Sequence, residues 1–148
     1  MFKSILIATD GSELSDKAVR DTLALARTVG AKTTAVTVMT PYSVMEGYRQ
    51  HVSDITAAME LHKVQAMGHA GQVLHKVEQA AQAAGVVCDL VRVEHERPWE
   101  AIIEAARARG CDLIAMASHG RSGMQALLVG SETQKVLTHS KTPVLVYR

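Results

Sequence analysis

Residues 4–12 read Ser4-Ile5-Leu6-Ile7-Ala8-Thr9-Asp10-Gly11-Ser12, and this stretch decides the fold class. Its first six residues form a nearly continuous apolar run, which is typical of a strand covered on both faces by helices. A turn at Asp10-Gly11-Ser12 follows, Ser12 can cap a helix, and apolar residues then recur at helical spacing up to Gly30. The stretch therefore predicts a central strand followed by a helix.

The same unit recurs along the rest of the chain. Further strands are predicted from β-branched or apolar content over residues 33–39, 86–93, 112–117 and 143–147. Trp99–Arg109 is predicted to be a helix, because Pro98 stands near its start and Gly110 just past its end. Strands that alternate with helices form a parallel sheet with helices on both faces, and ligands gather at the carboxyl ends of its strands.

The connection from Tyr42 to Gly85 is the longest one and is predicted to be mostly helical. Gly68 and Gly71 each cost a helix about 1 kcal/mol relative to Ala, so we expect a break or bend near them. Residues 41–50 are expected to form a mobile loop. Four methionines in or beside this connection are interpreted as flexible packing: Met39, Met45, Met59 and Met67.

Composition narrows the classes of function. The chain has 148 residues and no repeat or polar linker, so residues 1–148 are predicted to be a single domain. The net charge is +1 and aromatic residues make up 3% of the chain, so neither a polyanion-binding nor a base-stacking surface is expected. No apolar run approaches the roughly 20 residues that cross a bilayer, and no signal-peptide core is expected. We therefore expect no nucleic-acid and no membrane partner.

Cysteines and histidines indicate no metal site. Cys88 and Cys111 lie at the edges of apolar runs and are expected to be buried thiols rather than a disulfide. His62 with His69, or His69 with His75, lack the i, i+4 spacing of a helical zinc site. We interpret the histidines as solvated and expect no metal held by protein side chains. No G-x-S-x-G motif follows a strand, so no catalytic residue is assigned.

The stretch from Ala117 to Ser131 is the candidate site, since it follows a predicted strand and precedes a predicted helix. Glycines let backbone N–H groups approach an anion, and the first N–H groups of a helix lack internal partners. Ser131 could hydrogen-bond a phosphate oxygen, and Arg121 could add positive charge. In the alternative interpretation the glycines only turn the chain, and Ser131 caps its helix in a capping box with Gln134. Local chemistry supports both interpretations equally.

Two groups of residues, Ile5 to Ser12 and Ser118-His119-Gly120 followed after nine residues by Gly130-Ser131, resemble the universal stress protein family. The resemblance covers essentially the whole chain. It implies an α/β fold, with one doubly wound, Rossmann-like, five-stranded parallel sheet in the order 3-2-1-4-5 and helices on both faces. The ATP-binding branch has glycine at three positions, which correspond here to Ala117, Gly120 and Gly130. Because alanine is the next smallest residue, we expect binding to survive at Ala117.

The resemblance also implies which residues line the nucleotide. Asp10, with Ala8 and Thr9, is expected near the ribose and adenine, and the backbone of Val38 near the adenine edge. The alternative for Asp10 is a turn aspartate that bonds local N–H groups or caps the first helix. The other expected nucleotide-binding residues lie in or beside the stretch from Ala117 to Ser131, which we call the glycine loop: Met116, Ala117, His119, Gly120, Arg121, Gly130, Ser131, Glu132 and Thr133.

By the same resemblance, the chain is expected to be a cytoplasmic, ATP-binding regulator or adaptor of a stress response, with ATP as its cofactor, with or without Mg²⁺. One alternative is a slow Mg²⁺-dependent ATPase, for which Asp10 and His119 are the nearby candidates to position water. The other is a nucleotide-free dimeric adaptor, against which the presence of Gly120, Gly130 and Ser131 argues.

The closing strand, residues 143–147, is expected at an edge of the sheet. An unpaired apolar edge strand is a hazard unless it is covered or matched by a second copy. We therefore expect a homodimer through the C-terminal strand, which the family resemblance also implies.

Overall fold

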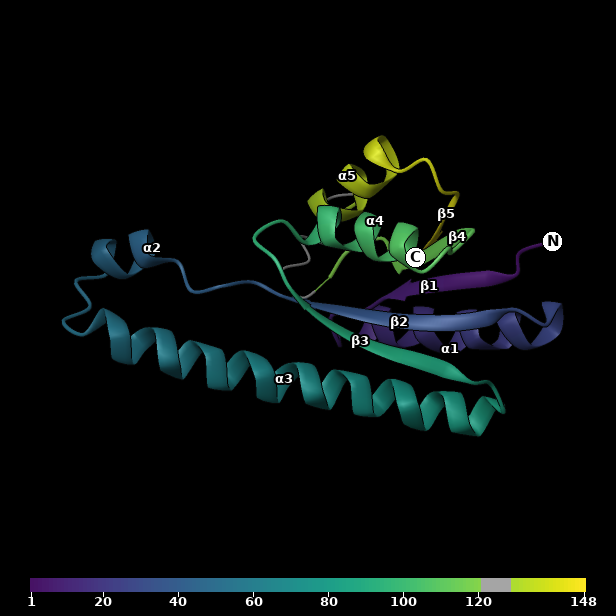
Figure 1. Cartoon of the computed structure of the whole chain (residues 1–148), viewed down its shortest axis with the longest axis horizontal. Helices are drawn as coiled ribbons and strands as arrows, with labels where there is room; N and C mark the ends of the chain where they lie inside the picture. Colours follow the sequence, from purple (N-terminus) through teal and green to yellow (C-terminus); the bar gives the residue numbers. More distant parts are fainter. Residues whose placement is uncertain (121–128) are drawn as a thin grey trace.

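The computed structural model describes residues 1–120 and 129–148. These residues form a five-stranded parallel sheet in the order β3-β2-β1-β4-β5, with helices on both faces (Figure 1). The strands are Ser4–Ala8 (β1), Lys32–Met39 (β2), Cys88–Glu94 (β3), Leu113–Ala117 (β4) and Val144–Tyr147 (β5). The helices are Glu13–Val29 (α1), Val44–Arg49 (α2), Ile55–Ala84 (α3), Pro98–Ala108 (α4) and Ser131–His139 (α5). The predicted fold class and strand order are confirmed.

The central strand β1 explains the continuous apolar run at the start of the chain. Ile5 and Ile7 pack in the core cluster under α1 and α3, whereas Leu6 and Ala8 pack in the cluster under α4 and α5. Successive side chains of a strand point to opposite faces, so a strand with helices on both faces has no solvent-facing position. The three residues from Ile5 to Ile7 are fully buried.

Helix α3 runs through Gly68 and Gly71 without interruption, so the expected break near these glycines is wrong. Neither glycine has a positive φ, which is consistent with regular helix. On its inner face α3 buries a row of apolar residues, Ala70, Val73, Val77 and Ala81. Most helical stability in proteins comes from such packing, and here it outweighs the local cost of the two glycines.

Residues 41–50, expected to be a mobile loop, contain the short helix α2. The Ser43 hydroxyl accepts a hydrogen bond from the Glu46 backbone N–H at 3.1 Å, and the space beside Gly47 is filled by Tyr42 and Ile55. The Ser43-x-x-Glu46 spacing is the sequence signal of an N-cap that could have indicated this helix.

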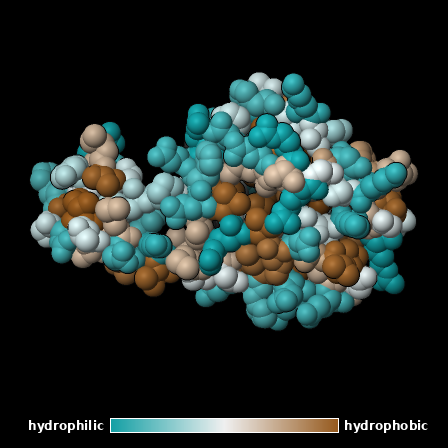
Figure 2. Space-filling view, viewed as in Figure 1, coloured by the Kyte–Doolittle hydropathy of each residue, from teal (hydrophilic) through white to brown (hydrophobic). Residues whose placement is uncertain are grey.

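Helix α2 and the N-terminal half of α3, residues 44–67, project past the sheet, and we call this segment the arm (Figure 1). Figure 2 shows hydrophobic side chains on the surface of this projecting end. Met45 is 63% exposed, Met59 45% and Met67 39%, so the interpretation of these three as packing residues is wrong.

Both cysteines are free thiols, as expected, with Cys111 buried and Cys88 partly buried. Burial raises the pKa of the Cys88 thiol, which disfavours the reactive thiolate. None of the described helices combines the length and the hydrophobicity that a membrane-spanning segment needs.

Candidate functional site

Three segments that lie far apart in the sequence meet at the carboxyl ends of β1 and β4. These two strands are neighbours, with Ile7 paired to Ala115. Gly120 lies so close to the Asp10 carboxylate that any side chain there would collide with it. The Gly130 N–H donates to the Ser118 carbonyl oxygen at 2.6 Å, which ties the start of α5 to the end of β4. The structure therefore brings Asp10, Gly120 and Gly130 together, as expected for one site.

The start of α5 favours anion binding over a purely structural turn. Gly130 is the N-cap, with φ −68° and ψ 160°, and no side chain caps the helix, so the capping box of Ser131 with Gln134 is wrong. Within the described residues, the backbone N–H groups of Ser131, Glu132 and Thr133 have no hydrogen-bond acceptor, and neither does the Ser131 hydroxyl. Unpartnered N–H groups at the positive end of a helix dipole form a ready site for phosphate or carboxylate.

The next two side chains of α5 have structural partners. The Thr133 hydroxyl donates to the Ala117 carbonyl oxygen at 2.9 Å. The Glu132 carboxylate accepts from the Trp99 backbone N–H at 2.9 Å and so satisfies a free donor at the start of α4. At the described site, Glu132 and Thr133 can therefore offer a ligand their backbone N–H groups rather than these side chains.

Asp10 forms the local turn that is the alternative to a ligand role. Its Oδ1 accepts from the Ser12 backbone N–H at 3.0 Å and from the Ser15 hydroxyl at 2.8 Å. The N-cap of α1 is Ser12 itself. The other carboxylate oxygen, Oδ2, is the atom that lies against Gly120. The turn thus holds the carboxylate in one orientation, directed at the glycine loop.

Helix α3 contributes a residue to the site that sequence reasoning missed. His69 Nε2 lies 3.2 Å from the Asp10 carbonyl oxygen, and since a carbonyl only accepts, Nε2–H is the donor. His62 Nε2 lies 2.8 Å from the Thr40 carbonyl oxygen in the same way. The interpretation of His69 as solvated is wrong, because its contact with Asp10 is partly buried. The His62 contact lies at the exposed surface, and His75 is exposed as expected. No local signal could reveal contacts across such sequence separations.

Six of the remaining predicted residues lie at or just beyond the carboxyl ends of β1, β2 and β4. Four of them are at most 7% exposed and could meet a ligand only over a small area: Ala8, Thr9, Met116 and Ala117. Continuing the register of β1 and β2 beyond the Ala8 and Val36 pair places Val38 level with Asp10. His119 Nδ1 is 3.0 Å from the Ser118 hydroxyl. Arg121 lies outside the described residues.

A hollow of about 240 Å³ opens where the arm joins the sheet, beside the carboxyl ends of β2 and β3. None of the predicted site residues lines it, and its walls come from the end of β2, α3 and β3: Met39, Thr40, Pro41, Tyr42, Met59, Glu60, His62, Lys63, Ala66 and Glu94. We place the candidate site at the start of α5 rather than at this hollow. The reason is that backbone N–H groups without an acceptor among the described residues lie together at the start of α5. Among residues 1–120 and 129–148, no group of three or more potential metal ligands is present.

Comparison with known proteins finds a family and solved structures that are similar to this chain. Residues 1–148 match the universal stress protein family. The chain is 30% identical over 153 residues to a universal stress protein of Methanocaldococcus jannaschii, covering 100% of this chain and 83% of that protein. It is 32% identical over 149 residues to one of Thermus aquaticus, covering all of both chains.

Two solved structures are similar over nearly their whole length. A hypothetical protein of Methanocaldococcus jannaschii has a TM-score of 0.80 and 25% identity, covering 99% of this chain and 96% of that one. A universal stress protein in complex with cAMP has a TM-score of 0.72 and 25% identity, covering 99% and 97%. The second of these relatives binds a nucleotide.

Proposed function

Because the chain belongs to the universal stress protein family, we propose that it binds ATP and acts as a nucleotide-dependent regulator or adaptor in a stress response. The observation that carries the proposal is the row of N–H groups at the start of α5 that have no acceptor among the described residues, at the same end of the sheet as the Asp10 carboxylate. Phosphates at this helix terminus and a ribose near Asp10 would meet groups of suitable chemistry at both ends of a nucleotide.

Ser131 is the proposed partner of the phosphates of the nucleotide. Its hydroxyl and backbone N–H stand at the first turn of α5, and the side chain is exposed. Thr133 and Gly130 fix the position of this turn against β4 through the Ala117 and Ser118 carbonyl oxygens. A turn held in place before the ligand arrives loses little conformational entropy on binding, which favours affinity.

Asp10 and Val38 are the proposed partners of the ribose and the adenine of the nucleotide. A carboxylate accepts hydrogen bonds from ribose hydroxyls, and the backbone at the end of β2 is the expected partner of the adenine edge. Ala117 replaces the first glycine of the ATP-binding branch, yet it is 5% exposed, so its methyl group adds little surface that a ligand could meet. We therefore propose ATP, with or without Mg²⁺, as the ligand.

Ser131→Ala provides the direct test of the phosphate site. We expect it to weaken ATP binding roughly tenfold, since hydrogen bonds to charged groups contribute about 1.5–3 kcal/mol. Thr138→Ala is the matched control on the same helix, because Thr138 is exposed and its hydroxyl donates only to the Gln134 carbonyl oxygen. Titration calorimetry with Mg²⁺-ATP measures both variants. Equal affinities for Ser131→Ala and the wild type would contradict the assignment.

The purified wild-type protein also distinguishes ATP binding from the two alternatives, a slow ATPase and a nucleotide-free adaptor. Denaturing the purified protein and identifying the released nucleotide by chromatography should yield an adenine nucleotide. Phosphate release that depends on Mg²⁺ and continues over many turnovers would support the slow ATPase. A protein that carries no nucleotide and takes up none in calorimetry would support the nucleotide-free adaptor and contradict the proposal.

We also expect a homodimer through β5 and a cytoplasmic location. The topology makes β3 and β5 the two edges of the sheet. β3 carries the charged residues Asp89, Arg92 and Glu94, which protect an edge from pairing, whereas β5 is the uncharged sequence Val-Leu-Val-Tyr. β5 is therefore the edge better suited to pair with a second copy.

A further inference from the structure

Helix α3 carries apolar residues on two opposite faces, and the described residues of the chain cover only one of these faces. The inner face packs on α1 and the sheet, as shown by the buried residues Ala70, Val73 and Val77. On the outer face Leu61 is 58% exposed and Val64 is 65% exposed. Exposed aliphatic residues in a helix that already has a buried face indicate a second contact surface.

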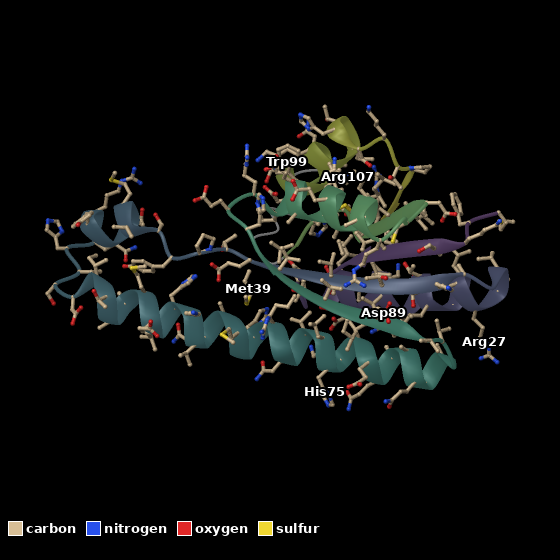
Figure 3. The ribbon with its side chains drawn as sticks, in the orientation of Figure 1. Arg27, Met39, His75, Asp89, Trp99 and Arg107 are labelled. Atoms are coloured by element: carbon tan, nitrogen blue, oxygen red, sulfur yellow. The ribbon has the colours of Figure 1, made fainter. Side chains whose placement is uncertain are left out.

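The outer face contains six residues at alternating spacings of four and three, Ala57, Leu61, Val64, Gly68, Gly71 and His75, and we call it the outer seam. This is the heptad spacing of a helix that packs lengthwise against another helix. In the part of the chain that the structure describes, nothing lies within 4 Å of a Cβ built on Gly68 or Gly71, so the space over both glycines is open there. Figure 3 shows His75, at the end of the seam, pointing away from the sheet.

The outer seam is symmetric about residue 66. Val64 and Gly68 lie at equal distances on either side of this centre, Leu61 and Gly71 likewise, and Ala57 and His75 form the outermost pair. When two such helices pack antiparallel across a two-fold axis at residue 66, each residue faces the residue of the second copy that lies equally far on the other side of this centre. Leu61 would then face Gly71 of the second copy, and Val64 would face Gly68.

On each copy, Leu61 and Val64 would therefore fill the spaces over Gly71 and Gly68 of the other copy. Glycines let two helices approach closely, and ridges of one helix fill the grooves of the other. A two-fold interface requires this self-complementarity, in which residue i contacts residue j and residue j contacts residue i. From the outer seam alone, a second copy of this chain is the occupant whose shape and order of residues fit.

We propose that the outer seam of α3 is a self-association surface, on which two copies of the chain pack as an antiparallel helix pair centred on residue 66. The proposal goes beyond nucleotide binding and does not depend on it. It also differs from pairing through β5, since α3 covers a face of the sheet whereas β5 forms its edge.

The size of the surface predicts the strength of the contact. The seam from residue 57 to residue 75 spans about 27 Å of helix. One helix face of this length offers fewer residues than the roughly 20–30 per side of a standard interface. We therefore expect association that increases with protein concentration and reverses on dilution.

Cross-linking through one introduced cysteine per variant tests the proposed antiparallel register. In the proposed pair two copies of residue 67 lie about 3 Å apart along the helix axis, whereas two copies of residue 75 lie about 27 Å apart. Met67→Cys should be joined into dimers by a short bis-maleimide linker at least five times more than His75→Cys. The wild type, which has only Cys88 and Cys111, gives the background. Equal yields from the two variants would overturn the proposed register.

Analytical ultracentrifugation of Val64→Glu tests the contact itself. Two carboxylates close to the two-fold axis should repel each other, so the average mass at high concentration should fall about twofold relative to the wild type. Val87→Glu is the matched control, because Val87 is 86% exposed and lies outside α3. Circular dichroism confirms that both variants fold. Identical sedimentation of Val64→Glu and the wild type over the whole concentration range would overturn the proposal.

Discussion

Individual residues at the two ends of the sheet show how one residue type serves different purposes. Asp10, at the carboxyl end of β1, directs its carboxylate at the glycine loop. Asp112 lies just before β4, at the opposite end of the sheet, and accepts the backbone N–H groups of Lys3 at 2.8 Å and Ser4 at 3.0 Å. The first aspartate lies against Gly120 at the proposed nucleotide site, whereas the second joins the chain before β4 to the start of β1.

The Asp112 contacts predict a specific acid sensitivity. Desolvation alone would raise the pKa of Asp112, but the N–H donors of Ser4 and Lys3 outweigh it and lower this pKa below its usual value. A carboxylate with a lowered folded-state pKa stabilises the fold above its unfolded pKa of about 3.9, and this contribution is lost as the pH falls through the folded-state value.

Asp112→Asn should therefore lower the free energy of unfolding at pH 7 by about 1 kcal/mol, a modest value because the group is accessible to water. It should also flatten the fall in stability below about pH 4. Urea unfolding across pH 2.5–7 measures both effects. Asp89→Asn is the control, since Asp89 is exposed and its ion pair with Arg109 is a loose 3.8 Å. If both variants gave the same pH profile, the role of the Asp112 contacts would be disproved.

At the scale of elements, α3 links the arm to the candidate site. His69 donates to the Asp10 carbonyl oxygen, and Val73 packs directly against Gly11. Gly11 has a φ of 78°, a backbone conformation that side chains disfavour, and a Cβ on it would lie 2.6 Å from Val73 Cγ2. The turn after β1 is thus shaped by α3 as well as by its own sequence.

Gly11→Ala should destabilise the protein by roughly 3 kcal/mol, because strain from positive φ adds to overpacking against α3. Gly30→Ala isolates the strain from positive φ. Gly30 has a φ of 71°, and no atom of the described residues lies within 4 Å of its Cβ position. We expect it to cost only about 1 kcal/mol. Chemical unfolding of the two variants measures the difference, and equal losses would show that the contact with Val73 adds nothing.

At the scale of the whole molecule, two surfaces with different geometry are available for assembly. β5 presents a sheet edge, and the outer seam of α3 presents a helix face. In the two proposed contacts each surface would pair by its own two-fold axis, so a substitution in one surface should leave the other contact in place.

Val146→Lys should remove the β5 contact while leaving the fold intact. Val146 belongs to neither core cluster, and a lysine on an edge strand opposes pairing. We expect about a twofold lower mass in light scattering, with unchanged cross-linking of Met67→Cys in the same background. Leu90→Lys on the other edge strand is the control. A mass equal to that of the wild type would contradict pairing through β5.

The sequence by itself determined the order and type of most elements. The apolar run of β1, the β-branched content of β2 and the Pro98 and Gly110 boundaries of α4 are local features, and the predicted strands end within two residues of the observed ones. The resemblance to a known family also singled out Asp10, Gly120 and Gly130, which the fold brings together. Periodicity and turn chemistry act over a few residues, so they can be read without the fold.

Only the tertiary structure decided features that depend on contacts between distant segments. Gly68 and Gly71 remain helical because the far side of α3 is packed on α1 and the sheet, which no local propensity can report. His69 is predicted to be solvated, but the fold places the Asp10 carbonyl oxygen beside it in a partly buried contact. The exposure of Leu61 and Val64 likewise became known only when the chain was seen to cover just the inner face of α3. Burial and long-range hydrogen bonds are properties of the packed molecule, so a sequence read locally does not contain them.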